Sequence, residues 1–313
     1  MKTLNIGFAG TPLFGLQALQ ALHDSRHTLK AIYTQPDRPA GRGRKLQASP
    51  IKEFATAHHI ALFQPLNFKQ DEEIVTLRSL ELDVLIVIAY GLILPTRVLE
   101  TPRHGCINVH ASLLPRWRGA SPIQQSLLHG DKETGVTIMQ MDKGLDTGDM
   151  LCLESISIEA TDTAETLHDK LAELAVRPLL QTLETIANGT VHRTPQQNED
   201  ATYAPKITKE EARLEWDQKI DIIDRKIRAY QPWPVAYTYL QNDLVRIHRA
   251  QKTEKTTHAK PGTIIELNKT GIFVATQDGV LQITFLQSPG GKVLPTHAWL
   301  QSHQTLQTGM SFA

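Results

Sequence analysis

The stretch DVLIVIAY, from Asp83 to Tyr90, holds an unbroken apolar run from Val84 to Ala89. A strand with one face in water alternates apolar and polar side chains, whereas a parallel strand covered on both faces is continuously apolar. The run is also far shorter than the roughly 20 apolar residues that a membrane-spanning helix needs. The stretch therefore predicts a buried central strand of a parallel sheet.

Strand and helix patterns alternate on both sides of this stretch. We expect further strands at Leu4 to Phe8, Leu29 to Thr34, Cys106 to His110 and Gly135 to Met141, and helices near Pro12, Pro50, Ile74 and Pro122. Strands separated by helices indicate an α/β fold with a doubly wound, mostly parallel, Rossmann-like sheet. Ligands of such sheets bind beyond the carboxyl ends of the strands, so we expect the chemistry there.

The pattern changes in the second half of the chain. A long helix from Thr163 to Ala187, ended by Asn188-Gly189, is expected to close a first domain over residues 1–190. The polar, Pro-punctuated segment 191–206 is typical of a linker. Short strand patterns between turn residues fill residues 207–313 and predict a small OB-like β-barrel. One large α/β domain is the alternative for a chain of 313 residues.

Composition places the chain among ordinary globular proteins, with 41% hydrophobic and 21% charged residues. The amino-terminal segment MKTLNIGFAGTP has too short an apolar region for a secretion signal, so we expect a cytoplasmic protein without a membrane contact. The 2 cysteines, Cys106 and Cys152, are too few for a disulfide framework or a metal site. Both lie in apolar runs, and we expect them to be buried core thiols.

The net charge is +0, but the charges are unevenly distributed along the chain. Residues 207–313 hold 13 Lys and Arg against 10 Asp and Glu. A tight basic cluster in the first part consists of Arg38, Arg42, Arg44 and Lys45. Local basic patches bind phosphate groups even when the whole chain is neutral. Ordinary solvent-exposed charge explains the excess of Lys and Arg in residues 207–313 equally well, but it is a weaker explanation for the tight cluster.

The turn from Gly7 to Gly15 invites a nucleotide-binding interpretation. It lacks the G-x-G-x-x-G spacing, and Leu16 and Gln17 stand where a phosphate-binding loop needs Lys and then Ser or Thr. We interpret it as a tight strand-to-helix turn.

The strongest local signal is the segment NVHASLLPRWRG, from Asn108 to Gly119. Residues two apart in a strand point to the same face, so Asn108 and His110 should project together at the carboxyl end of their strand. A lone His at a strand end is more often structural. An amide donor on the same face, followed by a loop with turn and basic residues, favours a catalytic pair.

An acidic, Gly-rich loop follows the strand that ends at Met141, and its carboxylates are Asp142, Asp146 and Asp149. The sequence argues against a calcium loop of the EF-hand kind, because Gly144 and Leu153 stand at two of its ligand positions. A solvated turn is the ordinary alternative. If the two strands are neighbours, Asp146 becomes a carboxylate beside the Asn-x-His pair.

The segments with the most specific patterns are FAGTP (Phe8 to Pro12), TQPDRPAGRG (Thr34 to Gly43), AYGLILP (Ala89 to Pro95), NVHASLLPRWRGASPI (Asn108 to Ile123), GVTIMQMDKGLDTGDM (Gly135 to Met150) and YQPWP (Tyr230 to Pro234). Through them, and along essentially its whole length, the sequence resembles the methionyl-tRNA formyltransferase family. The Asn-x-His and Asp146 elements alone imply only the wider formyltransferase superfamily, whereas the basic loop and the small-barrel segment favour the tRNA member.

The resemblance implies transfer of the formyl group of 10-formyltetrahydrofolate to the amino group of methionyl initiator tRNA, for translation initiation and without a metal. Such a transfer needs a proton acceptor for the amine and donors for the oxyanion. We expect Asn108 to be an oxyanion donor and His110 to donate to the oxyanion or the leaving nitrogen. Asp146 is expected to orient His110 and to take the amine proton.

The resemblance also implies the binding residues. It places the folate at Ser112, Leu113, Leu114 and Pro115. It places the acceptor end of the tRNA at Arg38, Arg42, Arg44 and Lys45, with Arg42 foremost, and gives the C-terminal domain contacts to tRNA phosphates. We expect the chain to act as a monomer.

Two alternatives stay open. The first is an enzyme of the same superfamily that acts on a nucleotide sugar or on glycinamide ribonucleotide. The second is an RNA-binding protein that has kept the fold and lost catalysis, against which the intact Asn108, His110 and Asp146 argue.

Overall fold

The computed structural model describes residues 2–40 and 45–313, which divide into two compact units. The first unit comprises Met1–Pro122, Glu133–Ser157 and His168–Ala204, and the second comprises Ile123–Lys132, Ile158–Leu167 and Pro205–Ala313. None of the helices in the described ranges is long and apolar enough to cross a membrane.

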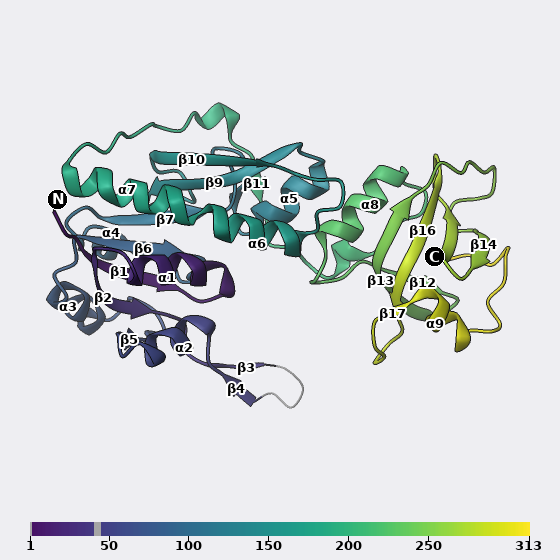
Figure 1. Cartoon of the computed structure of the whole chain (residues 1–313), viewed down its shortest axis with the longest axis horizontal. Helices are drawn as coiled ribbons and strands as arrows, with labels where there is room; N and C mark the ends of the chain where they lie inside the picture. Colours follow the sequence, from purple (N-terminus) through teal and green to yellow (C-terminus); the bar gives the residue numbers. More distant parts are fainter. Residues whose placement is uncertain (1, 41–44) are drawn as a thin grey trace. The chain divides into compact units, whose positions relative to one another are not determined.

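A 7-stranded sheet in the order β10-β9-β7-β6-β1-β2-β5 forms the centre of the first unit (Figure 1). Its strands are β1 (Asn5–Gly10), β2 (Thr28–Tyr33), β5 (Ala61–Phe63), β6 (Val84–Ile88), β7 (Cys106–His110), β9 (Glu133–Gln140) and β10 (Met150–Ser157). The strands β7, β6, β1, β2 and β5 are parallel to one another. Strand β9 runs antiparallel to β7, and β10 runs antiparallel to β9. All residues of β6 are buried, so the prediction of a doubly wound, mostly parallel sheet around this strand is confirmed.

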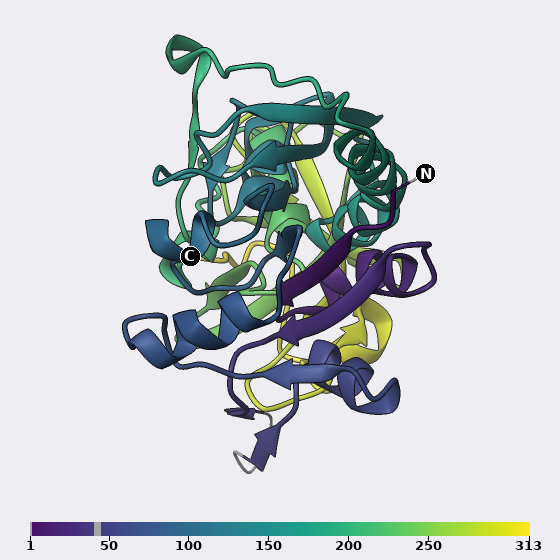
Figure 2. The ribbon, with the colours of Figure 1, turned by 90° about the vertical axis from the view of Figure 1, so that its left-hand side faces the viewer.

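Helices cover both faces of this sheet, as Figure 2 shows with α1 and α7 on one face and α3 on the other. The helices of the first unit are α1 (Leu16–His23), preceded by a short 3-10 turn (Leu13–Gly15), α2 (Pro50–Ala57), α3 (Asp71–Ser79), α4 (Thr96–Leu99) and α7 (Val176–Asn188). Helix α2 begins as its sequence predicts, because the Ser49 side chain accepts a hydrogen bond from the Lys52 amide and Pro50 occupies the first turn.

The expected single helix from Thr163 to Ala187 is two helices, α6 (Ala164–Leu174) and α7. The prediction was wrong at this point because Pro178 has no amide hydrogen for the carbonyl of Leu174, which interrupts the helical ladder. The expected end is confirmed, since Gly189 closes α7 in the left-handed conformation at φ 73.

The two cysteines differ in burial. Cys106 in β7 is buried, as expected, and burial raises the pKa of its thiol to about 12. Cys152 is only half-buried, so the expectation of a second core thiol was wrong. The reason is that β10 is the edge strand of the sheet and is covered less than the strands inside it.

The second unit is built on an antiparallel sheet in the order β12-β13-β16-β15-β14, with β17 paired to β16 (Figure 1). Its elements are α5 (Pro122–His129), α8 (Ile220–Ala229), α9 (Thr296–Gln301), β12 (Tyr237–Leu240), β13 (Asp243–Lys252), β14 (Ile264–Asn268), β15 (Gly271–Ala275), β16 (Val280–Gln287) and β17 (Leu294–Pro295). The buried residues Trp216, Trp299 and Phe312 fill its core. The sheet curls into a half-barrel, which confirms the predicted OB-like fold; α8 and α9 were not predicted.

The segment after α7 runs back along the first unit. Thr194 forms a β-bridge with Met150, at the start of β10. Further on, β11 (Tyr203–Ala204) pairs in parallel with β8 (Arg118–Gly119), the strand that follows the Asn-x-His element. The segment that the sequence marks as a linker is therefore hydrogen-bonded to the first unit at both of these places.

Candidate active site

Asn108 and His110 lie two residues apart in β7, so their side chains leave the same face of the sheet. Strand β7 pairs with β9, with Asn108 opposite Met139 and His110 opposite Thr137. The assumption that the two strands are neighbours is thereby confirmed. Asn108 is half-buried, and its side chain makes no hydrogen bond to another residue in the described part of the chain.

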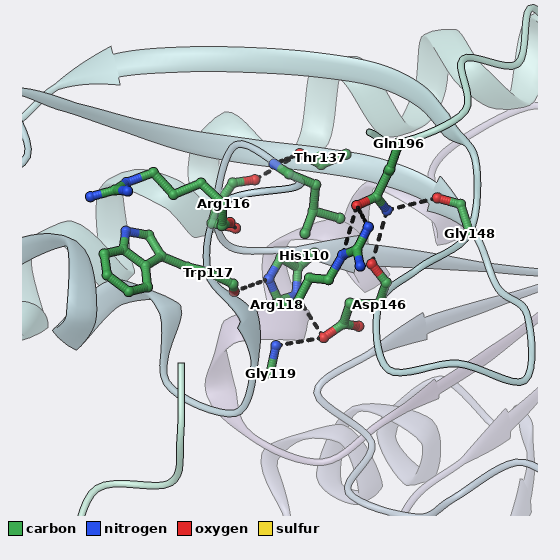
Figure 3. Close-up of polar contacts among 11 residues, drawn as sticks. His110, Arg116, Trp117, Arg118, Gly119, Thr137, Asp146, Gly148 and Gln196 are labelled. Carbon is green, nitrogen blue, oxygen red and sulfur yellow. Dashed lines mark hydrogen bonds and ion pairs between the residues drawn. The ribbon is translucent and has the colours of Figure 1, made fainter. Parts of the chain in front are cut away.

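Asp146 reaches His110 from the loop that follows β9. Because β9 runs antiparallel to β7, this loop starts beside the amino end of β7, where Gln140 pairs with Ile107, and must fold back to meet His110. The backbone makes this return with Asp146 itself at φ 53. Gly148 belongs to the same turn, because a Cβ there would lie 1.9 Å from the Gln140 carbonyl oxygen. Oδ2 of Asp146 ends 3.7 Å from Nδ1 of His110 (Figure 3).

The other ring nitrogen of His110 is already occupied. Nε2 lies 2.8 Å from the carbonyl oxygen of Trp117, and because a carbonyl only accepts, Nε2 carries the hydrogen of this bond. Trp117 has φ 63, a conformation that bulky side chains rarely adopt, and it directs the carbonyl toward the ring. Proton transfer by His110 therefore has to use Nδ1, the atom that faces Asp146.

Two hydrogen bonds hold Asp146, one at its side chain and one at its backbone. The Gly119 amide donates a hydrogen bond of 2.8 Å to Oδ2, and the side-chain amide of Gln196 donates to the Asp146 carbonyl at 2.9 Å. Gly119 has φ 117, and a Cβ there would lie 2.7 Å from the Ala204 carbonyl oxygen, so this close approach requires glycine. Sequence reasoning missed Gly119, Gln196 and the Trp117 carbonyl, because a backbone contact between distant segments leaves no local pattern.

The segment expected to bind folate follows β7 directly. Ser112 and Leu114 are buried and engaged within the protein, since the Ser112 hydroxyl donates to the Arg116 carbonyl at 2.6 Å and the Leu114 amide donates to the Thr137 hydroxyl at 3.1 Å. Leu113 and Pro115 are half-buried. The side chains of Leu113 and Pro115 are therefore the ones that keep surface for a ligand in this segment.

The basic cluster is described only in part. Arg38 is exposed and starts β3 (Arg38–Ala40), which pairs with β4 (Lys45–Gln47). Arg42 and Arg44 lie outside the described residues, and only the backbone of Lys45 is described. Just before β3, the Lys52 ammonium lies 2.8 Å from Asp37 Oδ2. Its hydrogen bond, followed by a weaker contribution from Gln64, lowers the pKa of the Asp37 carboxyl below its usual range.

The acidic loop does not form a metal cluster. Asp142 accepts hydrogen bonds from the Gly144 amide and the Thr147 hydroxyl, so its carboxylate serves the turn. In the residues that the structure describes, no group of three or more His, Cys, Asp or Glu side chains is placed to hold a metal ion.

Comparisons with known proteins place the chain in a family. Family models match as "Formyl transferase" over residues 1–183 and as "Formyl transferase, C-terminal domain" over residues 206–304. A curated methionyl-tRNA formyltransferase of Legionella pneumophila (strain Paris) is 58% identical over 311 residues, which is 99% of this chain and 99% of that one.

Solved structures share the fold at low sequence identity. The N-formyltransferase from Helicobacter canadensis, in complex with folinic acid and dTDP-3-aminofucose, aligns with a TM-score of 0.69 at 18% identity, over 90% of this chain and 99% of that one. HypX from Aquifex aeolicus, in complex with tetrahydrofolic acid, aligns with a TM-score of 0.66 at 18% identity, over 95% of this chain and 47% of HypX. With both family models and a full-length relative in agreement, the chain belongs to the methionyl-tRNA formyltransferase family.

Proposed function

We propose that the chain transfers the formyl group of 10-formyltetrahydrofolate to the α-amino group of methionine esterified to initiator tRNA. The observation that carries this proposal is the approach of the Asp146 carboxylate to Nδ1 of His110, in a chain of this family. The distance of 3.7 Å is longer than a hydrogen bond. A substrate atom or one water that lies beside the pair could hydrogen-bond to both groups.

Asp146 is the proposed acceptor of the amine proton. An α-amino group has a pKa of about 7.7 to 8.0, so much of it is protonated at neutral pH and must lose a proton before or during attack. Gly119 binds Oδ2, which fixes the orientation of the carboxylate toward His110. Asp146 can then take the proton directly or through one water.

His110 and Asn108 are proposed to act on the formyl oxygen and the leaving nitrogen. Because Nε2 of His110 is bound to the Trp117 carbonyl, the protonated ring can donate only from Nδ1. The uncommitted side-chain amide of Asn108 is a neutral donor for the negative charge that develops on the formyl oxygen. These two donors would meet the charge that develops on the formyl oxygen during attack.

The binding roles stay proposals of the same kind. Leu113 and Pro115, with backbone groups of Ser112 and Leu114, are proposed to contact the folate, whose one-carbon unit they would hold beside His110. Arg38, Arg42, Arg44 and Lys45 are proposed to bind the acceptor end of the tRNA, because Arg binds phosphates in pairs of hydrogen bonds and stacks on unpaired bases. We further propose that residues 207–313 form a separate tRNA-binding domain and that the protein is a cytoplasmic monomer.

A formylation assay with three acceptors tests the function. Purified protein and 10-formyltetrahydrofolate are mixed with methionyl initiator tRNA, with an amino-deoxy nucleotide sugar or with glycinamide ribonucleotide. We expect formyl transfer to the tRNA alone. Transfer to either of the other acceptors would indicate a different formyltransferase. If none of the three acceptors leads to release of tetrahydrofolate, the protein is a binding protein, and this result would also contradict the proposal.

A further inference from the structure

We infer that Gln196 is a positioning residue for formyl transfer: its side-chain amide ties the loop of Asp146 to the buried Arg118 and so keeps the carboxylate facing His110. The inference rests on the proposed function, because it concerns the same carboxylate. It adds a residue from the segment that the sequence marks as a linker.

Gln196 uses its whole side-chain amide in this connection (Figure 3). Nε2 donates to the carbonyl oxygens of Asp146 at 2.9 Å and of Gly148 at 2.8 Å. Oε1 accepts from Nε and Nη2 of Arg118 at 3.0 and 2.9 Å. A glutamine amide has two donor hydrogens and one acceptor oxygen, so no other side chain of this size could make all four contacts.

Arg118 is the anchor of this connection. It is 2% exposed, and it also donates to Oδ1 of Asn198 at 3.1 Å. The next residue, Gly119, donates to the Asp146 carboxylate. Asp146 is therefore held at two points, at its carbonyl through Gln196, which the Arg118 side chain anchors, and at its carboxylate through Gly119, the residue after Arg118.

The same segment also holds the partner of His110. The Thr202 hydroxyl accepts from the Trp117 amide at 2.9 Å, and the Thr202 carbonyl accepts from the Arg118 amide at 2.9 Å. The Trp117 carbonyl in turn binds Nε2 of His110. Within one segment after α7, Gln196 therefore positions Asp146, and Thr202 positions the Trp117 backbone that binds His110.

Replacing Gln196 by Glu separates positioning from general stability. Gln196→Glu keeps an acceptor for Arg118 but removes the hydrogens that bind the Asp146 and Gly148 carbonyls. A displacement of about 1 Å in a catalytic group typically costs on the order of a hundred-fold in rate, so we expect kcat to fall about ten- to a hundred-fold. The KM for 10-formyltetrahydrofolate and the melting temperature should stay near those of the unmodified protein.

A second variant and a control complete the set. Gln196→Met removes all four contacts and should lower kcat at least as much; if it fails to fold, Gln196→Glu alone carries the test. Gln197→Ala changes an exposed neighbour and should leave kcat unchanged. A lower melting temperature for Gln196→Glu with unchanged kcat would overturn the inference, because it would reduce Gln196 to a structural role.

A double-mutant cycle tests whether Gln196 acts through Asp146. If it does, Gln196→Glu should slow the Asp146→Asn variant by less than about threefold in single-turnover assays, since coupled residues are not additive. An equal slowing in both backgrounds would overturn the inference and leave the proposed function intact. Normal turnover of Asp146→Asn itself would instead contradict the proposed function.

Discussion

Nδ1 of His110 lies 3.7 Å from Oδ2 of Asp146, whereas Nε2 of the same ring lies 2.8 Å from the Trp117 carbonyl. The ring is thus anchored on one side and open on the other. A closed hydrogen bond to Asp146 would have to be broken before either group could serve a substrate. In the proposed mechanism the wider spacing leaves both groups available for proton transfer.

Asn108→Ala should fold normally and lose most of its turnover. Removing one oxyanion donor typically costs about 3 to 4 kcal/mol, which corresponds to on the order of a hundred-fold or more in kcat. The assay is formyl transfer with both substrates saturating, and circular dichroism checks the fold. Asn188→Ala is the control, since Asn188 is exposed at the end of α7. Near-normal turnover of Asn108→Ala would rule out its assigned role.

Arg42→Ala should raise the KM for methionyl initiator tRNA far more than the KM for folate. The loss of one phosphate contact should also make binding less sensitive to salt. Steady-state kinetics at several salt concentrations measure both effects. Arg78→Ala, which removes an exposed cation from α3, serves as the control. Equal increases in both KM values would show that Arg42 does not act on the tRNA.

Stability should fall when the pH drops below about 6.5, in part through His27. Burial, followed by the neighbouring Arg26, lowers the pKa of His27 in the folded protein, although Glu184 opposes the shift. The unfolded chain, with a His pKa of about 6.5, then binds the proton more readily, so protonation favours unfolding. Nδ1 accepts the Leu4 amide at 3.2 Å, which agrees with a neutral ring.

Urea unfolding at about pH 8 and about pH 5 measures this effect. His27→Gln keeps an acceptor for the Leu4 amide and removes the titrating group. The drop in the free energy of unfolding between the two pH values should be smaller in the variant. The same drop in both proteins would assign the pH dependence to other groups, among them His104 and His248, whose pKa values burial also lowers.

The thiols should react at different rates with a disulfide reagent. Burial raises the pKa of Cys106 to about 12, and the thiolate is the reactive form, so Cys106 should react only after unfolding. Cys152 is half-buried, and burial raises its pKa as well, so we expect one slow reacting thiol in the native protein. Cys152→Ser should abolish this reaction; its persistence would mean that Cys106 becomes exposed.

Much of the fold follows from local patterns. The apolar run of β6, the helix that begins at Pro50 and the short C-terminal strands all appear in the structure where local physical chemistry places them. The prediction of a single helix from Thr163 to Ala187 was wrong at Pro178, where the missing amide hydrogen outweighs the helical spacing of the apolar residues. The prediction that Cys152 is buried was wrong because the local sequence does not reveal which strand lies at the edge of the sheet.

The candidate site is predictable only where its residues share an element. Asn108 and His110 follow from strand periodicity, and the place of Asp146 follows once two strands are neighbours. Gln196 is different, because its four contacts join it to residues 48 to 78 positions away, and its own segment carries only the polar composition of a linker. Contacts of this range depend on the completed fold.

The most direct measurement is the single-turnover rate of formyl transfer to methionyl initiator tRNA by the wild-type protein and by Asp146→Asn. Asn keeps the size of the side chain and an oxygen for the Gly119 amide but cannot take the amine proton. We predict a rate lower by about a hundred- to ten thousand-fold, the usual contribution of a general base, with folate binding unchanged. A rate within about twofold of the wild type would contradict the account.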